Sequence, residues 1–561
     1  MAQREYDVLV VGSGAAGGMA AKVLTEHGLE VVVLEAGPSI KNTDFLTHAM
    51  PYDFPFRGRG NPQVIRKDGL LAAREQTPFS GYYAKESEHP YTNAPTTGAQ
   101  KPYKWTGRSR ILGGRTLHWG RQSFRLAEFD FKAASIDGFG VDWPFTYADL
   151  APYYDKVEDY VGIQGFQEGL PQIPDGRFLP PFAYNCFEHL IRKAAARKGW
   201  RMTALRTAQL SRYHRGRPPC HYCGSCGFGC DIGAFFSSIA VTLPDAAKTG
   251  KLTLLTDAVV REVAVDKEGR VRGVSYVDRK SKVERKVRAK VVVLAAGTLE
   301  STRILLNSVS RFHPQGMANA SGVLGHYLTD HFTAGQVIGV LPELVGSKIR
   351  NDDGKANGSY IPRYSNLGTR HPNFLRGYAI MVKGGSNVFP GHADLIGGFG
   401  AGYKKRIKDL HPAVVRIYAR GEPLQIFDSY VEIDKEVVDA WGIPVLKFHY
   451  KRTDNDYHML DDAFQNLEEL MHEAGAEILS EDKSLSAPGR IIHEMGTTRM
   501  GDDPRTSVLN QFCQAHEISN LFVMDGGCWP SSACQNPTET ILAIAWRSSD
   551  YLAEQFRTGD L

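Results

Sequence analysis

The chain has 561 residues, of which 42% are hydrophobic and 23% charged, an ordinary composition for a globular protein with more than one domain. Its formal net charge of +4 is small for this length and indicates no surface for nucleic acid or an anionic membrane. No apolar run approaches the roughly 18 residues of a membrane-spanning helix, and the first residues, MAQREYDVLVVG, lack a charged leader and an apolar signal segment. We therefore expect no export signal in this chain.

The first segment carries a dinucleotide-binding pattern. Residues 6–12, YDVLVVG, form an apolar run; GSGAAGG then opens a helical stretch, and EVVVLEAG follows as a second strand that ends at Glu35. In this pattern Gly12 permits the tight turn, Gly14 lets the backbone approach a pyrophosphate, and Gly17 lets helix and strand pack closely. The helix N-terminus offers free N–H groups to the phosphates. An acidic residue at position 35 suits a ribose hydroxyl and argues against a 2′-phosphate.

The rest of the chain predicts two interleaved domains. Residues 251–297 form a meander that closes on the strand KVVVLAAG and returns to the nucleotide-binding sheet. Residues 310–480 hold strands such as SYVEIDKEVV and IPVLKFHYK and then a long helix, which predicts an antiparallel sheet backed by helices. The fold class is therefore α/β, a Rossmann-like dinucleotide-binding domain interleaved with an α+β substrate domain. The expected ranges are 1–45, 105–130, 240–310 and 490–561 for the first domain, 131–239 and 311–489 for the second, and 46–104 for a loop-rich insertion.

Half of the chain's eight cysteines lie in one Gly-rich stretch, PPCHYCGSCGFGC at 218–230. The spacing C-x2-C-x2-C-x3-C is close to a bacterial iron–sulfur run and departs from it at Asp231, where that run has Pro. The pattern favours an iron–sulfur cluster, [4Fe–4S] first and [3Fe–4S] as an alternative, on Cys220, Cys223, Cys226 and Cys230. A structural zinc site and an unligated disulfide or redox loop stay open as alternatives. Cys186 could replace Cys230 as the fourth ligand.

Several stretches together resemble the glucose–methanol–choline oxidoreductases, a family of FAD enzymes that oxidise alcohols. The resemblance covers the whole chain in order, although TLESTRILLNSVS at 298–310 matches the family's second signature only loosely. Within the family it is strongest to bacterial FAD and iron–sulfur sugar dehydrogenases, including large subunits that oxidise carbon 3 of glucosides, and to pyranose oxidases. The stretches are GSGAAGG with Glu35, RILGGRTLHWGRQSFR at 110–125, HEMGTTRMG at 493–501 and MDGGCWPSSACQNPTETI at 524–541.

The resemblance implies a set of site residues. His493 is expected to take the hydroxyl proton, because a histidine suits general-base work near neutral pH, and Asn536 is expected to orient the substrate oxygen. Thr538 begins the helix that the family points at the flavin, and Asp525 lies near the ribityl chain unless it only caps a turn. GGRTLHW resembles the pyranose-oxidase stretch whose histidine is joined covalently to FAD, so a covalent link at His118 stays open. The expected FAD contacts are Gly12, Gly14, Gly17, Glu35, Gly114, Thr116, His118, Val260, Asp525 and Thr538.

An iron–sulfur cluster beside a flavin favours a dehydrogenase over an oxidase that uses oxygen. A hydride delivers two electrons together, whereas cytochromes accept one at a time, so a cluster predicts a dehydrogenase with a cytochrome or quinone acceptor. Together with this, the family resemblance implies an FAD-dependent dehydrogenase for a secondary alcohol of a sugar or glucoside, with carbon 3 as first choice. The alternatives are a pyranose-type oxidase that uses oxygen, a gluconate or glucose carbon-1 type dehydrogenase, and a flavin-containing assembly subunit without turnover. The related dehydrogenases also imply a small partner subunit that carries the export signal, which leaves a cytoplasmic or a co-exported periplasmic location.

Overall fold

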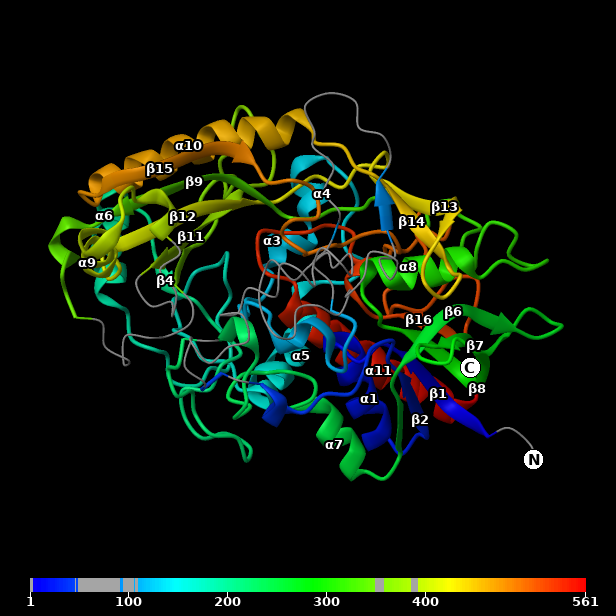
Figure 1. Ribbon diagram of the computed structural model, residues 1–561. Coiled ribbons are helices and arrows are strands. Elements are labelled where there is room, and N and C mark those ends of the chain that lie inside the picture. Colours follow the sequence, from blue (N-terminus) through cyan, green and yellow to red (C-terminus); the bar gives the residue numbers. More distant parts are fainter. Residues whose placement is uncertain are drawn as a thin grey trace.

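The computed structural model describes residues 4–45, 47–48, 91–93, 105, 109–224, 226–348, 358–384 and 392–561. Two large β-sheets lie at opposite ends of the molecule, and helices pack around and between them (Figure 1). The loop-rich insertion predicted at 46–104 lies outside the described residues except for 47–48 and 91–93. The domain boundaries given above stay predictions, whereas the α/β fold class is confirmed.

The seven-stranded sheet holds the predicted dinucleotide-binding unit. Its order is β5-β2-β1-β8-β7-β6, and β16 pairs with β8. The five strands β5, β2, β1, β8 and β16 pair in parallel, while β6, β7 and β8 form the predicted antiparallel meander. The parallel strands β1 and β2 are near-continuous Val and Leu runs, and Val8–Val11 and Val31–Leu34 are buried on both faces of the sheet. The strands are β1 (Glu5–Val11), β2 (Val31–Leu34), β5 (Leu252–Leu255), β6 (Ala258–Val265), β7 (Val271–Asp278), β8 (Glu284–Leu294) and β16 (Leu521–Val523).

Helices from distant parts of the chain cover this sheet. The first helix, α1, packs against α7 and against the C-terminal helix α11, and α11 in turn packs against α5. In Figure 1 the blue α1 and the red α11 accordingly lie side by side, although they come from opposite ends of the sequence. The helices are α1 (Ala15–Glu26), α5 (Tyr147–Val161), α7 (Thr242–Lys248), α8 (Thr298–Asn307) and α11 (Thr538–Thr558).

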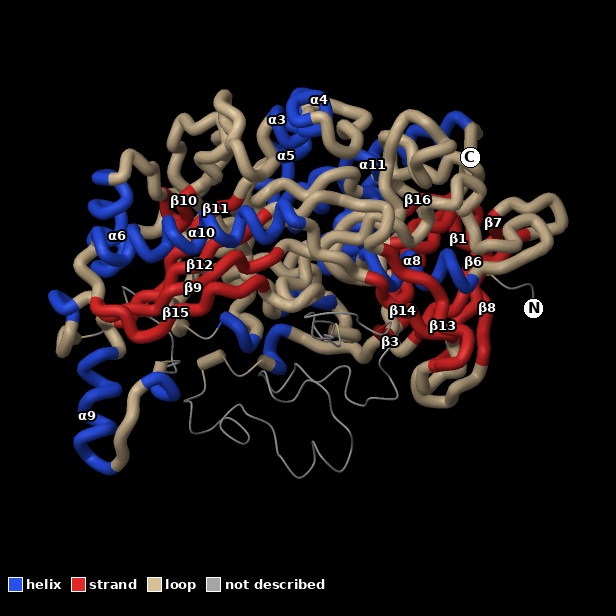
Figure 2. The backbone as a smooth tube through the Cα atoms, turned by 90° about the horizontal axis from the view of Figure 1, so that it is seen from above, coloured by secondary structure: helices blue, strands red, loops and turns tan. Residues whose placement is uncertain are grey.

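The six-stranded sheet is fully antiparallel, as predicted for the second half of the chain. Its order is β15-β9-β12-β11-β10-β4. The long helix α10 and the helix α6 lie along this sheet (Figure 2) and bury their apolar faces against one side of it. From the other side, Lys383 and Arg420 line the pocket described below. The elements are β4 (Thr203–Ala204), β9 (Phe332–Val340), β10 (Ser359–Ile361), β11 (Tyr378–Gly384), β12 (Val414–Gly421), β15 (Glu477–Leu485), α6 (Cys186–Arg197) and α10 (Asp454–Glu473).

Two strands that the sequence places in this antiparallel sheet lie elsewhere. The strands β13 (Tyr430–Val438) and β14 (Pro444–His449) form a separate three-stranded sheet with β3 (Tyr91–Asn93). The reason is side-chain packing: Phe448 stacks on Trp105 with ring centroids 4.3 Å apart, and Arg303 of α8 donates to the carbonyls of Ile443 and Pro444 at 2.8 Å. The hairpin is thereby fixed to α8 and to the nucleotide-binding sheet.

Three short helices complete the described part: α3 (Glu128–Phe131), α4 (Ala133–Asp137) and α9 (Gly400–Leu410). Across the described ranges, no helix combines the length and the apolar character that crossing a bilayer would require.

Candidate functional site

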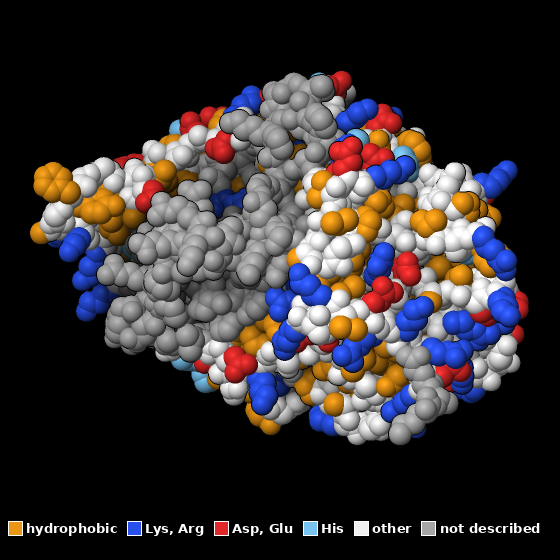
Figure 3. Space-filling model, turned by 45° about the vertical axis from the view of Figure 1, so that its right-hand side comes forward, with side chains coloured by type: hydrophobic (Ala, Val, Ile, Leu, Met, Phe, Trp, Pro, Cys, Tyr) orange, Lys and Arg blue, Asp and Glu red, His pale blue; other side chains and the backbone are white. Residues whose placement is uncertain are grey.

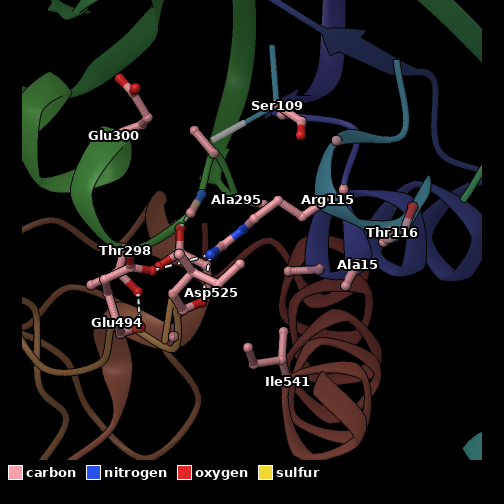
Figure 4. A pocket seen from close by; sticks show the side chains of 18 of the residues that line it. Ala15, Ser109, Arg115, Thr116, Ala295, Thr298, Glu300, Glu494, Asp525 and Ile541 are labelled. Atoms are coloured by element: carbon pink, nitrogen blue, oxygen red, sulfur yellow. Dashed lines mark hydrogen bonds and ion pairs between the residues drawn. The ribbon is translucent and has the colours of Figure 1, made fainter. Parts of the chain in front are cut away.

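A cavity of about 390 Å³ lies where the seven-stranded sheet, the loop at 109–122 and the start of α11 meet. Side chains from these three regions and from 491–494 converge on it (Figure 4). The sequence-predicted residues that line it are Gly12, Gly14, Glu35, Gly114, Thr116, His118, Val260, His493, Asp525, Asn536 and Thr538. Gly17 and the four loop cysteines are outside this lining.

The turn between β1 and α1 has the shape that the glycine pattern requires. Gly12 has φ +97°, and a Cβ there would lie 2.5 Å from the Ala295 carbonyl oxygen of the neighbouring strand. A Cβ on Gly17 would lie 2.0 Å from the Gly12 carbonyl oxygen, so Gly17 serves packing and not direct contact with a ligand. A Cβ on Gly14 would meet nothing within 4 Å. Gly14 is also the N-cap of α1 and offers no side-chain cap, so the helix N–H groups are open to an anion in the cavity.

Glu35 joins this turn to the 109–122 loop. Its carboxylate accepts hydrogen bonds from Gly37 N at 2.9 Å and from Ser13 Oγ at 2.5 Å, and Ser13 Oγ itself accepts from Gly113 N at 2.9 Å. Burial raises the pKa of Glu35, while these hydrogen bonds act in the opposite direction. Glu35 thus lines the cavity just after β2 and connects the β1–α1 turn to the 109–122 loop through Ser13.

Two residues of the 109–122 loop reach into the cavity from the opposite wall. Arg115 extends across it and donates from Nη1 to the Ile492 carbonyl at 2.5 Å and to Glu494 Oε2 at 3.2 Å (Figure 4). His118 Nε2 lies 2.9 Å from Ser109 Oγ. Burial, together with the charges of Arg115 and Arg121, lowers the pKa of His118 to about 4, so this imidazole is neutral at working pH.

Asp525 lines the cavity and also caps a turn, so a place near the cofactor and a capping role are compatible. Its carboxylate accepts from Ser301 Oγ at 2.5 Å, Gly297 N at 3.1 Å and Gly527 N at 3.0 Å. These bonds tie the β8–α8 turn to the turn that follows β16. Burial raises the pKa of Asp525, and the three donors oppose that shift.

A directed chain of hydrogen bonds surrounds His493. Arg420 Nη1 donates to Asn536 Oδ1 at 2.5 Å, which turns the amide so that Asn536 Nδ2 lies 3.3 Å from His493 Nε2. On the other side of the ring, His493 Nδ1 lies 2.9 Å from His331 Nδ1. His331 Nε2 in turn lies 2.6 Å from the Ala533 carbonyl oxygen.

The chemistry of these partners assigns the protons. A carbonyl oxygen only accepts, so His331 carries its proton on Nε2. Burial and the charge of Arg420 lower the pKa of His331 to about 3, so the ring is neutral and its Nδ1 is an acceptor. His493 must then carry its proton on Nδ1, which leaves a lone pair on Nε2. Burial, Arg420 and His331 also lower the pKa of His493 well below its ordinary value, so this lone pair is available as a base.

The backbone that carries His493 is held in a strained shape. Ile492 has φ +62°, the left-handed region that a β-branched residue rarely adopts. The Asp330 carboxylate accepts from Ile491 N at 3.0 Å and from His493 N at 2.7 Å, and Arg115 binds the Ile492 carbonyl. Burial and the nearby Glu494 raise the pKa of Asp330 to about 7. Adjacent residues at the start of β9, Asp330 and His331, therefore fix both the backbone and the ring of the base.

No sequence motif marks His331, Arg420 or Asp330. They lie in LTDHFT and IYARGE, stretches without a spacing pattern of known chemistry. Their importance follows from the structure, in which all three are charged or polar residues at most 6% exposed.

The cysteine loop lies next to the wall that carries His118. The Trp119 side chain lines the cavity, and Arg121 Nη1 donates both to the Trp119 carbonyl at 2.6 Å and to the Cys226 carbonyl at 3.3 Å. A second link runs from Trp119 Nε1 to the Phe236 carbonyl at 2.9 Å, just after the loop. The loop is therefore separated from the cavity wall by a single arginine side chain.

The donor set of this loop suits a cluster, but the structure does not gather it into a metal site. Cys220 Sγ accepts from Tyr222 N at 3.3 Å and Cys230 Sγ accepts from Ala234 N at 3.3 Å, the kind of N–H···S bonds that tune iron–sulfur ligands. Among the residues that the structure describes, however, no three His, Cys, Asp or Glu side chains form a group that could hold a metal ion. Cys186 lies at the start of α6 and is exposed.

The fold and the cavity are those of a dinucleotide-binding protein in which His493 lines the binding cavity. Models of the GMC oxidoreductase family match residues 6–333 and 427–545, and the first match alone covers more than half of the chain. The chain therefore belongs to the GMC oxidoreductases. It is an FAD-dependent oxidoreductase that acts on alcohol groups.

Relatives of known activity match along nearly the whole chain. A 2-methyl-1,2-propanediol dehydrogenase from Mycolicibacterium austroafricanum is 27% identical, covering 98% of this chain and 96% of its own. A fructose dehydrogenase large subunit from Gluconobacter japonicus is 27% identical over 99% and 98%. A C-glycoside 3-oxidase from Arthrobacter globiformis is 25% identical over 98% and 95%. The crystal structure of pyridoxine 4-oxidase from Mesorbium loti superposes with a TM-score of 0.62 at 17% identity, over 98% of this chain and 99% of that one, which shows a shared fold.

Proposed function

We propose that this chain is an FAD-dependent dehydrogenase that oxidises a secondary alcohol of a sugar or glucoside, with carbon 3 as first choice. The relatives named for fructose and for position 3 of C-glycosides support a sugar substrate. The observation that carries the proposal is the unprotonated Nε2 of His493, which faces the Asn536 amide N–H at 3.3 Å; both residues line the cavity.

The residues of the chain divide the work at the reacting carbon. His493 Nε2 takes the hydroxyl proton, and Asn536 Nδ2 holds the substrate oxygen while Arg420 fixes the orientation of the amide. FAD bound in the cavity supplies the acceptor for the hydride. Thr538 begins α11 at the cavity wall, so the positive end of the helix dipole favours negative charge that develops there.

For the exit of electrons we propose an iron–sulfur cluster on Cys220, Cys223, Cys226 and Cys230, with [4Fe–4S] favoured over [3Fe–4S]. The cysteine spacing, the N–H···S bonds and the link from Trp119 through Arg121 to the loop support this proposal. A cluster passes electrons one at a time, which suits a cytochrome or quinone acceptor. The relative named as a large subunit supports a small partner subunit here as well.

Anaerobic titration of the iron-replete, FAD-loaded protein with a panel of sugars and glucosides tests this proposal. Flavin bleaching and a low-temperature EPR signal are expected together, followed by rapid turnover with a one-electron dye and little with oxygen. Turnover with oxygen and no EPR signal would favour the pyranose-type oxidase, which the GGRTLHW stretch and the relative named a C-glycoside 3-oxidase support. No bleaching by any alcohol would leave the assembly-subunit alternative.

The link between His118 and FAD stays a proposal of its own. His118 lies in the GGRTLHW stretch, lines the cavity and is neutral, which an imidazole that attacks a flavin requires. Acid precipitation tests it: a covalent flavin stays with the protein pellet, whereas a non-covalent flavin is released to the supernatant.

A further inference from the structure

Arg420 is a buried cation whose observed partners are neutral. It is 6% exposed, lines the cavity, and donates to the side-chain oxygens of Asn536 and Gln122. Its Nε has no hydrogen-bond partner among the described residues, and none of their carboxylates forms an ion pair with it. A buried charge is costly unless it is paired, so this guanidinium favours an anion that enters the cavity from outside.

Two more cations share the face of the sheet that carries Arg420. Side chains at alternate positions of β12 point to the same face, which places Arg416 and Tyr418 in line with Arg420. In the antiparallel register Lys383 of β11 lies directly opposite Arg416, and its side chain also lines the cavity. We call Lys383, Arg416 and Arg420 the cationic strip. It runs from the exposed Arg416 to the buried Arg420, which donates to Asn536 beside His493.

The cationic strip lowers the pKa of Tyr418, which lies among its three side chains. Lys383 Nζ lies 5.6 Å and the Arg416 guanidinium 5.1 Å from the Tyr418 ring centroid. Burial alone would raise the pKa of Tyr418, but the charges of Lys383, Arg420 and Arg416 outweigh it and lower this pKa to about 8. Figure 3 shows Lys and Arg side chains (blue) spread over the described part of one face of the molecule, with Asp and Glu (red) between them.

Two acidic residues of this region, Glu422 and Glu494, form ion pairs with arginines outside the strip. Glu422, two positions beyond Arg420, pairs with Arg363 and Arg376. In the cavity wall Glu494 pairs with Arg115. Among the described residues, no carboxylate forms an ion pair with Lys383, Arg416 or Arg420, so the strip keeps its positive charge.

We propose that the substrate is an anionic sugar or polyol, whose carboxylate or phosphate group binds Lys383 while one of its secondary hydroxyls reaches His493. This inference rests on the proposed function and narrows its substrate class. Charge-assisted hydrogen bonds to carboxylate or phosphate are stronger than neutral ones, so the negative group supplies both affinity and orientation. A substrate with a cationic group would meet like charge at the same place and is disfavoured.

Matched pairs of compounds test the proposal through the second-order rate constant of anaerobic flavin reduction. D-gluconate and D-glucuronate are the carboxylate arm, D-glucose 6-phosphate is the phosphate arm, and D-sorbitol, D-glucose and methyl glucoside are the neutral references. We expect at least one anionic arm to exceed its neutral references by about tenfold, and that advantage to shrink at high salt. The arm that responds identifies carboxylate or phosphate. Neutral compounds that react as fast as every anionic one would overturn the proposal.

The variant Lys383→Met removes the charge and keeps most of the length of the side chain. It is expected to lower the rate constant for the preferred anion about tenfold more than that for the neutral references. Lys267→Met is the matched control, because Lys267 is exposed in the turn between β6 and β7 and should change neither rate. An equal loss with anionic and neutral compounds in Lys383→Met would contradict the anion site.

A binding measurement separates this inference from the proposed function. Isothermal titration calorimetry of the FAD-loaded protein should detect gluconate or glucose 6-phosphate, and Lys383→Met should weaken that binding. If neutral sugars alone bleach the flavin and neither anion binds, the dehydrogenase stands and the anion site is wrong. If an anion binds and loses affinity in Lys383→Met while no compound bleaches the flavin, the anion site stands and the proposed chemistry is wrong.

Discussion

Replacing His331 with leucine removes the acceptor that keeps the proton of His493 on Nδ1. In the wild type that proton lies between two Nδ1 atoms 2.9 Å apart, and the Ala533 carbonyl fixes the far side of His331 at 2.6 Å. Without the acceptor, the N–H of His493 is left buried and unpaired, or the proton moves to Nε2 and blocks the base. His331 thus acts through His493 as a positioning residue.

The size of the effect follows from the cost of that unpaired donor. A buried donor without a partner costs about 1–3 kcal/mol. Because each 1.4 kcal/mol is a factor of ten in rate, His331→Leu should slow flavin reduction roughly 5- to 150-fold. Substrate affinity should change little, because His331 is outside the cavity lining and His493 Nε2 still faces the substrate.

Anaerobic stopped-flow measurement of flavin bleaching at saturating sugar checks this prediction, with FAD content and the flavin spectrum measured on each variant. His331→Asn keeps an acceptor oxygen near the Nδ1 position and should recover most of the rate. His516→Leu is the control, since it also breaks one histidine hydrogen bond, the 2.9 Å contact with Ser507, at a site outside the cavity lining. A His331→Leu rate within twofold of wild type, or no recovery in His331→Asn, would refute the proton assignment.

Three further predictions follow from the same structure. Because burial and Arg420 lower the pKa of His493, its base form persists as pH falls, so flavin reduction should stay level from pH 8 to pH 6; a decline centred near 6.5, the ordinary histidine value, would contradict this. In Gly14→Ala the new Cβ meets nothing within 4 Å, so the variant should fold normally, but it should bind FAD weakly because the methyl group faces the phosphate site. In Gly17→Ala the new Cβ would lie 2.0 Å from a backbone oxygen, so the variant should yield little folded protein. Equal yields and FAD contents in the two variants would count against the assigned roles. Cys226→Ser should lose bound iron and slow dye reduction while sugar still bleaches the flavin; unchanged iron content would exclude the cysteine run as a cluster site.

Local pattern was sufficient to predict the nucleotide-binding half of the fold. The alternation of apolar strand, glycine turn and helix at 6–35 is determined by neighbouring residues, and β1, α1 and β2 follow it. The hairpin of β13 and β14 could not be assigned in this way. Its strand pattern is clear, but its partner is set by the stacking of Trp105 on Phe448, residues 343 positions apart in sequence numbering (448 − 105).

The same division applies to the site. Motif resemblance located His493 and Asn536, and the structure brings both into one cavity. Motif resemblance could not locate His331 or Arg420, because each acts through a contact with a residue far along the chain. His331 contacts His493, 162 positions away, and Arg420 contacts Asn536, 116 positions away. The cysteine run remains a prediction, since sequence spacing fixes the order of the thiols and leaves their positions around a metal undetermined.

The central claim is that His493 removes the hydroxyl proton as the alcohol is oxidised. The most direct measurement compares wild type with His493→Ala, both loaded with FAD, by anaerobic flavin bleaching on addition of the best sugar from the panel. The account predicts an unchanged FAD content and a loss of bleaching in the variant, with chemical reduction of the flavin by dithionite intact in both. Bleaching by sugar at the wild-type rate in His493→Ala would contradict the account.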